Sequence, residues 1–238
     1  MIDTHACFMQ CLRKIRGLDI IEGISYHELY SLQRILATVQ KNGLVAIEIG
    51  SWKGCSSYFL AHVLSHLKGC KLYCIDTWKG NTGTWNIEEG GRFDIKKIFE
   101  YNVAEFSDII IPINEDSKTA HTQFKDDSAD FIFIDGDHTY DGMLADLTNY
   151  YPKLKKGGII SGHDSNSKFG MLSPKAQQEI GEYCDIDCVY VESLGKRVHC
   201  GVTVALFDFF DDDYLRTADE FSRAEEGVKN SIWWKIKS

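Results

Sequence analysis

Two short polar segments of this chain concentrate the residue types that carry chemistry. Residues 135–138 read Asp-Gly-Asp-His, and a second segment is His163-Asp164; each directly follows an apolar run typical of a buried strand. If the two strands are neighbours, Asp135, His163 and Asp164 come within reach of one divalent ion. Mg²⁺ prefers oxygen ligands, and a histidine shifts the preference toward Mn²⁺ or a later metal. The alternative is that both aspartates hydrogen-bond only to loop amides.

His138 is the candidate general base of this group. Its ordinary pKa near neutrality suits the removal of a proton from a hydroxyl, and a divalent ion would assist by lowering the pKa of that hydroxyl. Asp137 is predicted to do the same or to orient His138. A buried histidine with a purely structural role is the alternative interpretation.

A third polar segment, residues 48–54, reads Glu-Ile-Gly-Ser-Trp-Lys-Gly after another apolar run. Gly50 and Gly54, on either side of Ser51, permit a tight turn into a helix and close approach of a ligand to the backbone. The denser Gly-x-Gly-x-x-Gly pattern of dinucleotide sites is absent. The carboxylate of Glu48 favours a cationic ligand, and S-adenosylmethionine carries a sulfonium and an ammonium group. An ordinary turn with a solvated glutamate is the alternative.

Two further acidic segments are candidates for holding a nucleoside. Asp76, followed by Thr77 and Trp78, ends a short apolar run and can accept hydrogen bonds from the ribose hydroxyls. This feature alone does not separate NAD from S-adenosylmethionine, and a surface aspartate in a turn would look the same. Asp116 and Ser117 are predicted to flank the adenine, but a helix N-cap explains Asp116 equally well.

The elements that would position these residues are short apolar runs alternating with amphipathic helices. Buried strands are predicted at residues 44–49, 72–75, 109–113, 131–134 and 159–162. Helical spacing of apolar residues separates them. This alternation predicts an α/β fold with a doubly wound, Rossmann-like, mostly parallel sheet. In such sheets, ligands bind beyond the carboxyl ends of the strands, where the polar segments lie.

The last third of the chain predicts a different arrangement. Residues 188–192 and 202–207 are strand-like, and the segment between them is too short for a crossover helix. We therefore expect an antiparallel hairpin at the sheet edge. The domain is expected to span 41–210, with an N-terminal helical extension over 1–40 and an acidic, amphipathic, partly helical tail over 211–238.

Composition excludes some classes of function. The chain has 238 residues and a net charge of −9, which argues against nucleic acid or an anionic membrane as a partner. No segment approaches the roughly 20 apolar residues of a membrane span, and no secretory signal is visible. The eight cysteines form no Cys-x-x-Cys pair or recognised zinc pattern. We expect reduced thiols and a cytoplasmic location.

Four segments together resemble a known family. Residues 45–54, 73–76, 131–140 and 156–165 are similar to the strand-end motifs of class I S-adenosylmethionine-dependent methyltransferases. More closely, the Asp-Gly-Asp-His-x-Tyr run and the later Gly-His-Asp resemble the macrocin and mycinamicin group of sugar O-methyltransferases. The similarity covers roughly residues 40–210.

The resemblance implies a seven-stranded sheet whose last strand is antiparallel. It also implies that Glu48, Gly50 and Gly54 line the methionine part of the cofactor and that Asp76 holds the ribose. In the resembling enzymes, the aspartate matching Asp135 binds Mg²⁺ and the histidine matching His138 is the proposed base. An acidic pair after the fifth strand completes their metal site; here the pair is His163-Asp164, which departs from that pattern.

The expected function is transfer of a methyl group to a hydroxyl of a sugar or other small molecule, assisted by Mg²⁺ or Mn²⁺. Loops that carry Trp85, Phe169 and Met171 are expected to shape the acceptor pocket. Two alternatives stay open: an NAD-dependent oxidoreductase and a non-catalytic protein that only binds the cofactor. A homo-oligomer is also left open.

Overall fold

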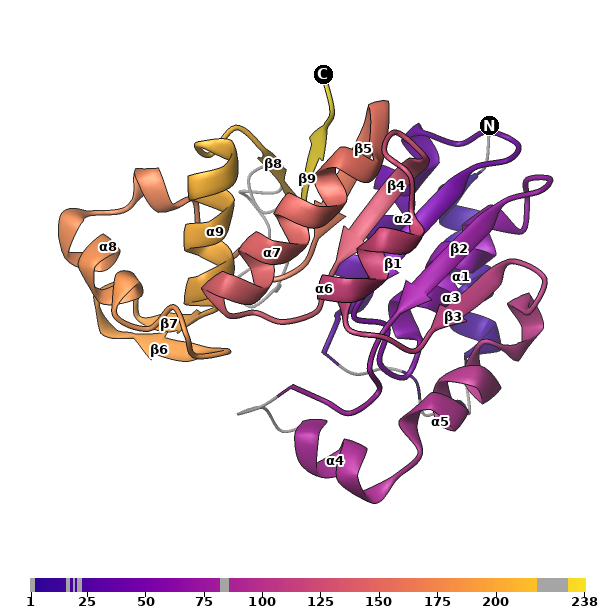
Figure 1. Cartoon of the computed structure of the whole chain (residues 1–238), viewed down its shortest axis with the longest axis horizontal. Helices are drawn as coiled ribbons and strands as arrows, with labels where there is room; N and C mark the ends of the chain where they lie inside the picture. Colours follow the sequence, from indigo (N-terminus) through magenta and orange to yellow (C-terminus); the bar gives the residue numbers. More distant parts are fainter. Residues whose placement is uncertain (1–2, 16–17, 19, 21–22, 82–85, 218–230) are drawn as a thin grey trace.

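The computed structural model describes residues 3–15, 18, 20, 23–81, 86–217 and 231–238 (Figure 1). A seven-stranded sheet with the order β3-β2-β1-β4-β5-β9-β8 crosses the molecule. Its strands are β1 Val45–Ile49, β2 Lys71–Ile75, β3 Ile110–Ile113, β4 Ala129–Ile134, β5 Leu154–Gly162, β8 Leu215–Arg216 and β9 Trp233–Ile236. Strands β1 to β5 pair in parallel. The predicted α/β fold with a mostly parallel sheet is confirmed.

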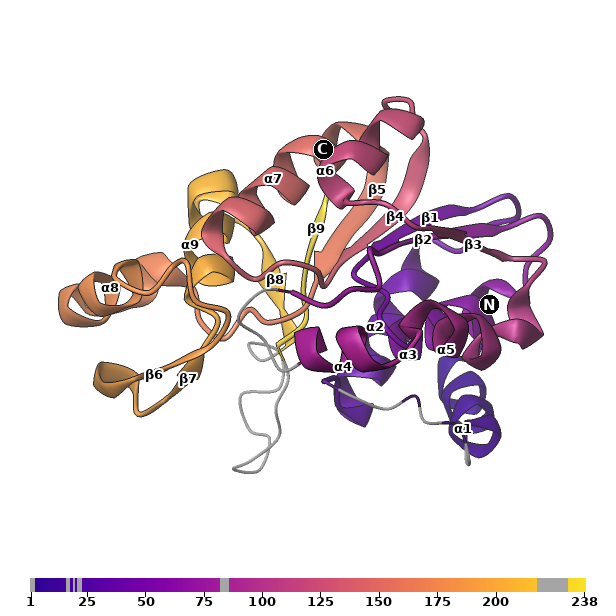
Figure 2. The same cartoon turned by 60° about the horizontal axis from the view of Figure 1, so that its bottom comes forward.

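Helices cover both faces of the sheet (Figure 2). One face carries α1 Thr4–Lys14, α2 Tyr26–Thr38, α3 Cys55–Leu64 and α5 Ile95–Asn102, and the other carries α6 Ser117–Ala120, α7 Tyr140–Tyr150 and α9 Cys200–Phe210. Two separate clusters of buried apolar side chains fill the two interfaces. Strands between two such layers are apolar on both sides, which is why they read as continuous hydrophobic runs.

The predicted edge hairpin over 188–192 and 202–207 is wrong. Residues 202–207 lie inside α9, where Val202, Ala205 and Leu206 are buried against the rest of the core. Their helical spacing buries one face, and this packing outweighs the strand preference of the β-branched residues in the run. The first segment instead forms β6 Val189–Val191, which pairs with β7 Lys196–Val198 in a small separate sheet.

The antiparallel edge comes from the segment predicted as a tail. Strand β9 runs antiparallel to β5, and β8 pairs antiparallel with β9. The side chain of Trp233 is fully buried and contacts the rings of Phe210 and Tyr214. Gly162 faces this indole so closely that a Cβ atom there would lie 2.6 Å from it. The remainder of the tail, residues 218–230, lies outside the described residues.

A small lobe completes the described structure beside α9. It contains α8 Pro174–Gly181, β6 and β7 (Figure 1), whereas α4 Asn86–Arg92 lies below the sheet in the same view. Among the described residues, no helix has both the length and the apolar character needed to cross a bilayer.

The strand order reverses at the centre of the sheet. Strand β1 lies between β2 and β4, so the crossover connections leave in opposite directions from this point. A crevice opens there beyond the carboxyl ends of the strands, where open α/β sheets bind ligands. The predicted polar segments after β1, β2, β4 and β5 therefore meet at one edge.

Candidate functional site

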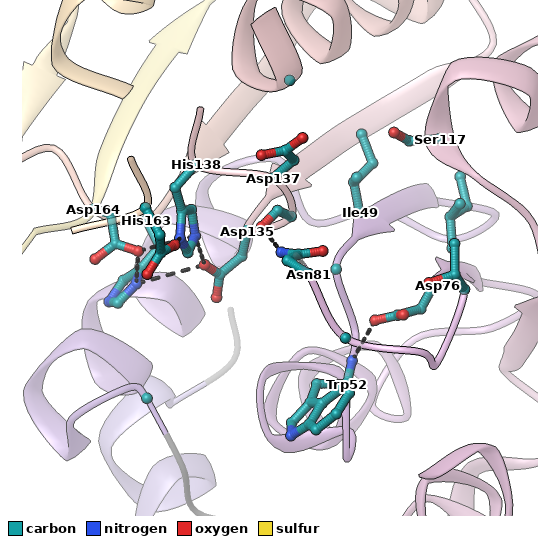
Figure 3. A pocket seen from close by; sticks show the side chains of 18 of the residues that line it. Ile49, Trp52, Asp76, Asn81, Ser117, Asp135, Asp137, His138, His163 and Asp164 are labelled. Atoms are coloured by element: carbon teal, nitrogen blue, oxygen red, sulfur yellow. Dashed lines mark hydrogen bonds and ion pairs between the residues drawn. The ribbon is translucent and has the colours of Figure 1, made fainter. Parts of the chain in front are cut away.

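A cavity of about 460 Å³ lies at this switch point (Figure 3). Ten of the predicted site residues line it: Gly50, Asp76, Thr77, Asp116, Ser117, Asp135, Asp137, His138, His163 and Asp164. Figure 3 shows two ends, with Asp76 and Ser117 at one and the Asp135, His138, His163 and Asp164 side chains at the other. The site is therefore elongated and chemically different at its two ends.

Asp76 joins the loops that follow β1 and β2. Its Oδ2 accepts a hydrogen bond from the backbone N–H of Trp52 at 2.7 Å, and its Oδ1 accepts one from the N–H of Trp78 at 2.6 Å. The indole of Trp78 is buried and donates to the Trp52 carbonyl at 2.9 Å. Burial raises the pKa of Asp76, and the backbone hydrogen bonds oppose that change. The carboxylate is thus fixed while it faces the cavity.

Gly50 allows the β1–α3 loop to touch the end of β4. Its φ is +83°, and a Cβ atom there would lie 1.9 Å from the carbonyl oxygen of Asp135. Such a distance is far inside van der Waals contact, so only glycine fits both the dihedral and the space. The close approach brings the backbone of Gly50 and the side chain of Asp135 to one cavity wall.

Glu48 lies beneath the loop and does not line the cavity. Side chains alternate along a strand, so Glu48 points toward α3 while Ile49 lines the cavity. The carboxylate is fully buried and accepts hydrogen bonds from Ser51 Oγ at 2.6 Å and from Ser57 Oγ. Burial raises its pKa. Of the predicted cofactor residues, Glu48, Ser51, Gly54 and Trp78 are therefore placed behind the cavity wall.

Asp116 is both a helix N-cap and a residue of the cavity wall, so it has features of both roles that the sequence leaves open. It is the N-cap of α6, and its Oδ1 accepts a hydrogen bond from the N–H of Lys118 at 2.8 Å. Asp116 and Ser117 also line the cavity at the end occupied by Asp76. The cap orients the start of α6 toward the cavity.

The predicted metal ligands are brought together at the other end. Asp135, His163 and Asp164 each offer a ligand atom within 4.8 Å of the others. His163 Nδ1 lies 3.1 Å from Asp164 Oδ2 and 3.6 Å from Asp135 Oδ1. Burial opposes a charged imidazole, but these two carboxylates raise the pKa of His163 well above its ordinary value.

The second nitrogen of His163 faces a residue that sequence reasoning missed. Glu28 of α2 is buried, and its Oε1 lies 3.2 Å from His163 Nε2. The same oxygen accepts hydrogen bonds from the N–H and the hydroxyl of Ser231 at 2.9 and 2.8 Å. Glu28 also forms a capping box with Ser25 at the start of α2.

His138 lies on the opposite side of the same carboxylate pair. Its Nε2 is 3.2 Å from Asp164 Oδ2 and 3.4 Å from Asp135 Oδ1, and its Nδ1 is 2.6 Å from Asp187 Oδ1. Burial disfavours the imidazolium, yet the three carboxylates raise the pKa of His138 well above its ordinary value. Both ring nitrogens therefore face carboxylates in this arrangement.

Asp187, and not Asp137, is the carboxylate that orients His138. The Oδ1 of Asp137 accepts a hydrogen bond from the N–H of Thr139 at 3.0 Å, which shapes the turn before α7. A Cβ atom at Gly142 would lie 2.4 Å from the carboxyl carbon of Asp137, so this packing requires glycine there. Asp137 still lines the cavity.

His199 is a further member of the cluster that the sequence left unassigned. Its Nε2 lies 3.3 Å from Asp164 Oδ1, and its ring meets that of His138 edge-on at 4.7 Å between centroids. His199 directly precedes α9, while Asp187 directly precedes Cys188 and β6. His199 lies between the two strands of the predicted hairpin and Asp187 directly precedes it, and neither was predicted as a site residue.

The residues expected to shape an acceptor pocket are placed elsewhere or not described. Phe169 packs against Phe207 of α9, with ring centroids 5.3 Å apart, and Met171 is 81% exposed. Trp85 lies outside the described residues. The lobe instead contributes Asp187, Cys188, Arg197 and His199 to the cavity wall.

The cluster fits a divalent cation. Two carboxylates face each other with imidazole nitrogens on either side. Asp187 holds the outer nitrogen of His138 by a hydrogen bond, and Glu28 lies at ion-pair distance, 3.2 Å, from the outer nitrogen of His163; carboxylates at these positions orient histidine ligands in metal sites. Asp164 also has a left-handed backbone, φ +63°, a conformation that tends to persist at functional sites. The mixed oxygen and nitrogen donors suit Mn²⁺ or a later metal better than Mg²⁺.

Comparison with known proteins decides the family. Residues 47–165, half of the chain, match a family described as a methyltransferase domain. This chain belongs to that methyltransferase family. The match begins in β1 and ends just after the His163-Asp164 pair, so it contains two of the four carboxylates of that cluster, Asp135 and Asp164, and two of its three histidines.

A curated relative of this methyltransferase is the uncharacterized protein R132 of Acanthamoeba polyphaga mimivirus. The two are 29% identical over 145 residues, which is 58% of this chain and 59% of the relative. The chain thus covers about three fifths of that relative's length.

Solved structures share the fold over nearly the whole methyltransferase. An O-methyltransferase from Bacillus cereus in complex with SAH has a TM-score of 0.56 and 16% identity, with 98% of this chain and 91% of that chain covered. The O-methyltransferase TomG from Streptomyces achromogenes, involved in tomaymycin synthesis and solved with SAM, has a TM-score of 0.57 and 12% identity, with 100% and 91% covered. At these identities the likeness establishes the fold.

The contact between Gly50 and Asp135 leads to a stability prediction for the methyltransferase. Gly43→Ala places a side chain at φ +71° with open space around it and should lower the free energy of unfolding by about 1–2 kcal/mol. Gly50→Ala has a similar φ but adds the clash with the Asp135 carbonyl, which should cost roughly a further 1–3 kcal/mol. Urea unfolding of both variants measures the difference. Equal destabilisation would show that the loop and the end of β4 are not in contact.

Proposed function

We propose that this methyltransferase transfers the methyl group of S-adenosylmethionine to a hydroxyl oxygen of a small molecule. One observation supports this proposal most directly. Asp76 and Ser117 lie at one end of the cavity, and the Asp135–Asp164 cluster lies at the other end of the same cavity. The first end suits a nucleoside, and the second suits an acceptor whose oxygen must lose a proton.

The charge of the cavity supports a cationic methyl donor. Its lining includes the carboxyl groups of Asp76, Glu115, Asp116, Asp135, Asp137, Asp164 and Asp187, and an acidic cleft raises the local concentration of a cation. Asp76 lies where a carboxylate accepts hydrogen bonds from ribose hydroxyls. The glycine pattern of dinucleotide sites is missing after β1, which favours methyl transfer over hydride transfer to NAD.

We further propose that Asp135, His163 and Asp164 hold a divalent cation, Mn²⁺ rather than Mg²⁺. When bound, the ion would position the acceptor oxygen, lower the pKa of its hydroxyl and offset the carboxylate charges that face His138. Glu28 is not one of these ligands, but it faces the far nitrogen of His163 at 3.2 Å and so orients the imidazole ring toward the ion site. His199 contacts the same carboxylate, Asp164, from the lobe.

His138 is the proposed proton acceptor. Asp187 at 2.6 Å keeps a proton on Nδ1, so the atom that receives the substrate proton is Nε2, which faces the Asp135 and Asp164 carboxylates. A base oriented by a carboxylate on its other nitrogen is a recurring arrangement. The enzyme otherwise needs to hold donor and acceptor in line, because proximity and orientation supply much of the rate.

The acceptor class is proposed from the resemblance of the Asp-Gly-Asp-His-x-Tyr and Gly-His-Asp segments to sugar O-methyltransferases. Arg197, which donates to the Cys188 carbonyl at 3.0 Å, and His199 line the acceptor end. These donors suit a polyhydroxylated molecule, such as a sugar, that offers several oxygen acceptors.

The cofactor assignment predicts binding of S-adenosylhomocysteine. Wild-type protein should show a concentration-dependent rise in melting temperature with S-adenosylhomocysteine and none with NAD. Asp76→Ala should weaken the affinity at least about tenfold, since a hydrogen bond to a charged group contributes about 1.5–3 kcal/mol. Asp108→Ala, at an exposed position before β3, is the matched control and should bind normally. Isothermal titration calorimetry gives the constants, and NAD binding in place of S-adenosylhomocysteine would refute the assignment.

The base assignment predicts a separation of catalysis from cofactor binding. His138→Ala should lower kcat by about 10²–10⁴-fold while the affinity for S-adenosylhomocysteine changes little. Asp187→Asn should lower kcat in the same direction by less and leave KM for the acceptor unchanged. Release of S-adenosylhomocysteine with hexoses, deoxyhexoses and catechols as acceptors, in the presence of Mn²⁺, measures turnover. An undiminished kcat in His138→Ala would remove this residue from the mechanism.

A further inference from the structure

A second group of metal-ligating side chains lies outside the cavity, where α1 packs against α3. Cys7 comes from α1, and His62 and His66 come from α3 and the turn that follows it. Each offers a ligand atom within 4.8 Å of the other two. None of the three is used by the cofactor or acceptor chemistry described above.

Cys7 and His62 lie close enough together to bind the same ion. Cys7 Sγ lies 3.0 Å from His62 Nδ1, and both side chains are almost fully buried. A bound zinc ion with bonds of about 2.0–2.3 Å would place its ligand atoms roughly 3.5 Å apart. The three donor atoms, which all lie within 4.8 Å of one another, are therefore close to the spacing that one ion requires.

His66 has the tautomer that a metal ligand needs. Its Nδ1 lies 2.8 Å from the carbonyl oxygen of His62, so Nδ1 donates a hydrogen bond and the lone pair is left on Nε2. Histidine ligands usually donate their second N–H to a carbonyl or carboxylate in this way. His66 is exposed, which gives an ion a path from solvent to the two buried donors.

Cys11 lies one turn after Cys7 on α1 and is buried. The sulfur of Cys11 accepts a hydrogen bond from Gln33 Nε2 at 3.4 Å. Cys11 is thus engaged in its own contacts, and we do not count it as a ligand.

We propose that Cys7, His62 and His66 form a zinc site that links α1 to α3. One thiolate and two imidazoles are soft and borderline donors, which select Zn²⁺ over Mg²⁺, Ca²⁺ or Mn²⁺. A water molecule completes the tetrahedron on the exposed side. The group matches no sequence motif because its cysteine lies 55 residues before His62, while the two histidines, one on α3 and one in the turn after it, are four residues apart.

Cobalt substitution tests the site with a signal that the Asp135–Asp164 cluster cannot give. Full-length protein freed of metal by a chelator is titrated with Co²⁺ and followed by absorption spectroscopy. A thiolate ligand produces a near-ultraviolet sulfur-to-cobalt charge-transfer band, whereas the aspartate and histidine donors of the other site do not. We expect the band to appear in wild type, to saturate at one Co²⁺ per chain and to disappear on addition of one equivalent of Zn²⁺.

Variants connect the band to these residues. Cys7→Ser and His66→Ala should each lose it, and His66→Ala keeps the experiment valid if Cys7→Ser fails to fold because His66 is exposed. Cys70→Ser changes a buried cysteine outside the group and should retain it. Zn²⁺ should raise the melting temperature of an Asp164→Asn variant, in which the other metal group is disrupted, but not that of the double variant Asp164→Asn/His66→Ala. Absence of the band from the wild-type protein would overturn the proposal, as would a band that persists in both Cys7→Ser and His66→Ala.

Discussion

The mutual repulsion of two carboxylates, the partly buried Asp135 and the buried Asp164, is the constraint on which the site depends. Two like charges in a low-dielectric environment are strongly unfavourable unless opposite charges or hydrogen bonds surround them. Here three imidazoles do so: His163, His138 and His199 each direct a nitrogen at this pair. The raised pKa values of His163 and His138 are the other side of the same interaction. A cation between the carboxylates would serve the same electrostatic purpose.

That cluster also explains how distant parts of the chain are held in place. Glu28 of α2 reaches His163 and, with the same oxygen, Ser231 next to β9. Asp187 and His199 join it from the segments that flank the β6–β7 hairpin. Residues from α2, from the segment before β9 and from both flanks of the β6–β7 hairpin therefore meet at the carboxyl ends of β4 and β5. An open α/β sheet offers that edge as a binding surface, and here residues from α2 and from the flanks of the β6–β7 hairpin add to it.

The sequence predicted what depends on local patterns. Strand ends carry polar residues directly after apolar runs, so Asp76, Asp135 and the His163-Asp164 pair could be assigned to one edge once a parallel sheet was expected. Glu48 was assigned to the right strand, but its direction depends on which face α3 covers. Asp187 and His199 could not be found, because the run over 202–207 satisfies strand preference and helical burial equally and only packing against the core decides between them. The contact of Glu28 with His163 spans 135 positions, and no local pattern encodes it.

One crystal tests the central claim directly: that the cavity places a methyl donor at the Asp76 end and a cation at the Asp135–Asp164 pair. Crystals grown with S-adenosylhomocysteine and Mn²⁺, measured at a wavelength where manganese scatters anomalously, locate both ligands at once. We expect the ribose on Asp76, the sulfur directed toward His138, and an anomalous peak between Asp135 and Asp164. An adenosine bound away from Asp76, or manganese found only outside the cluster, would contradict it.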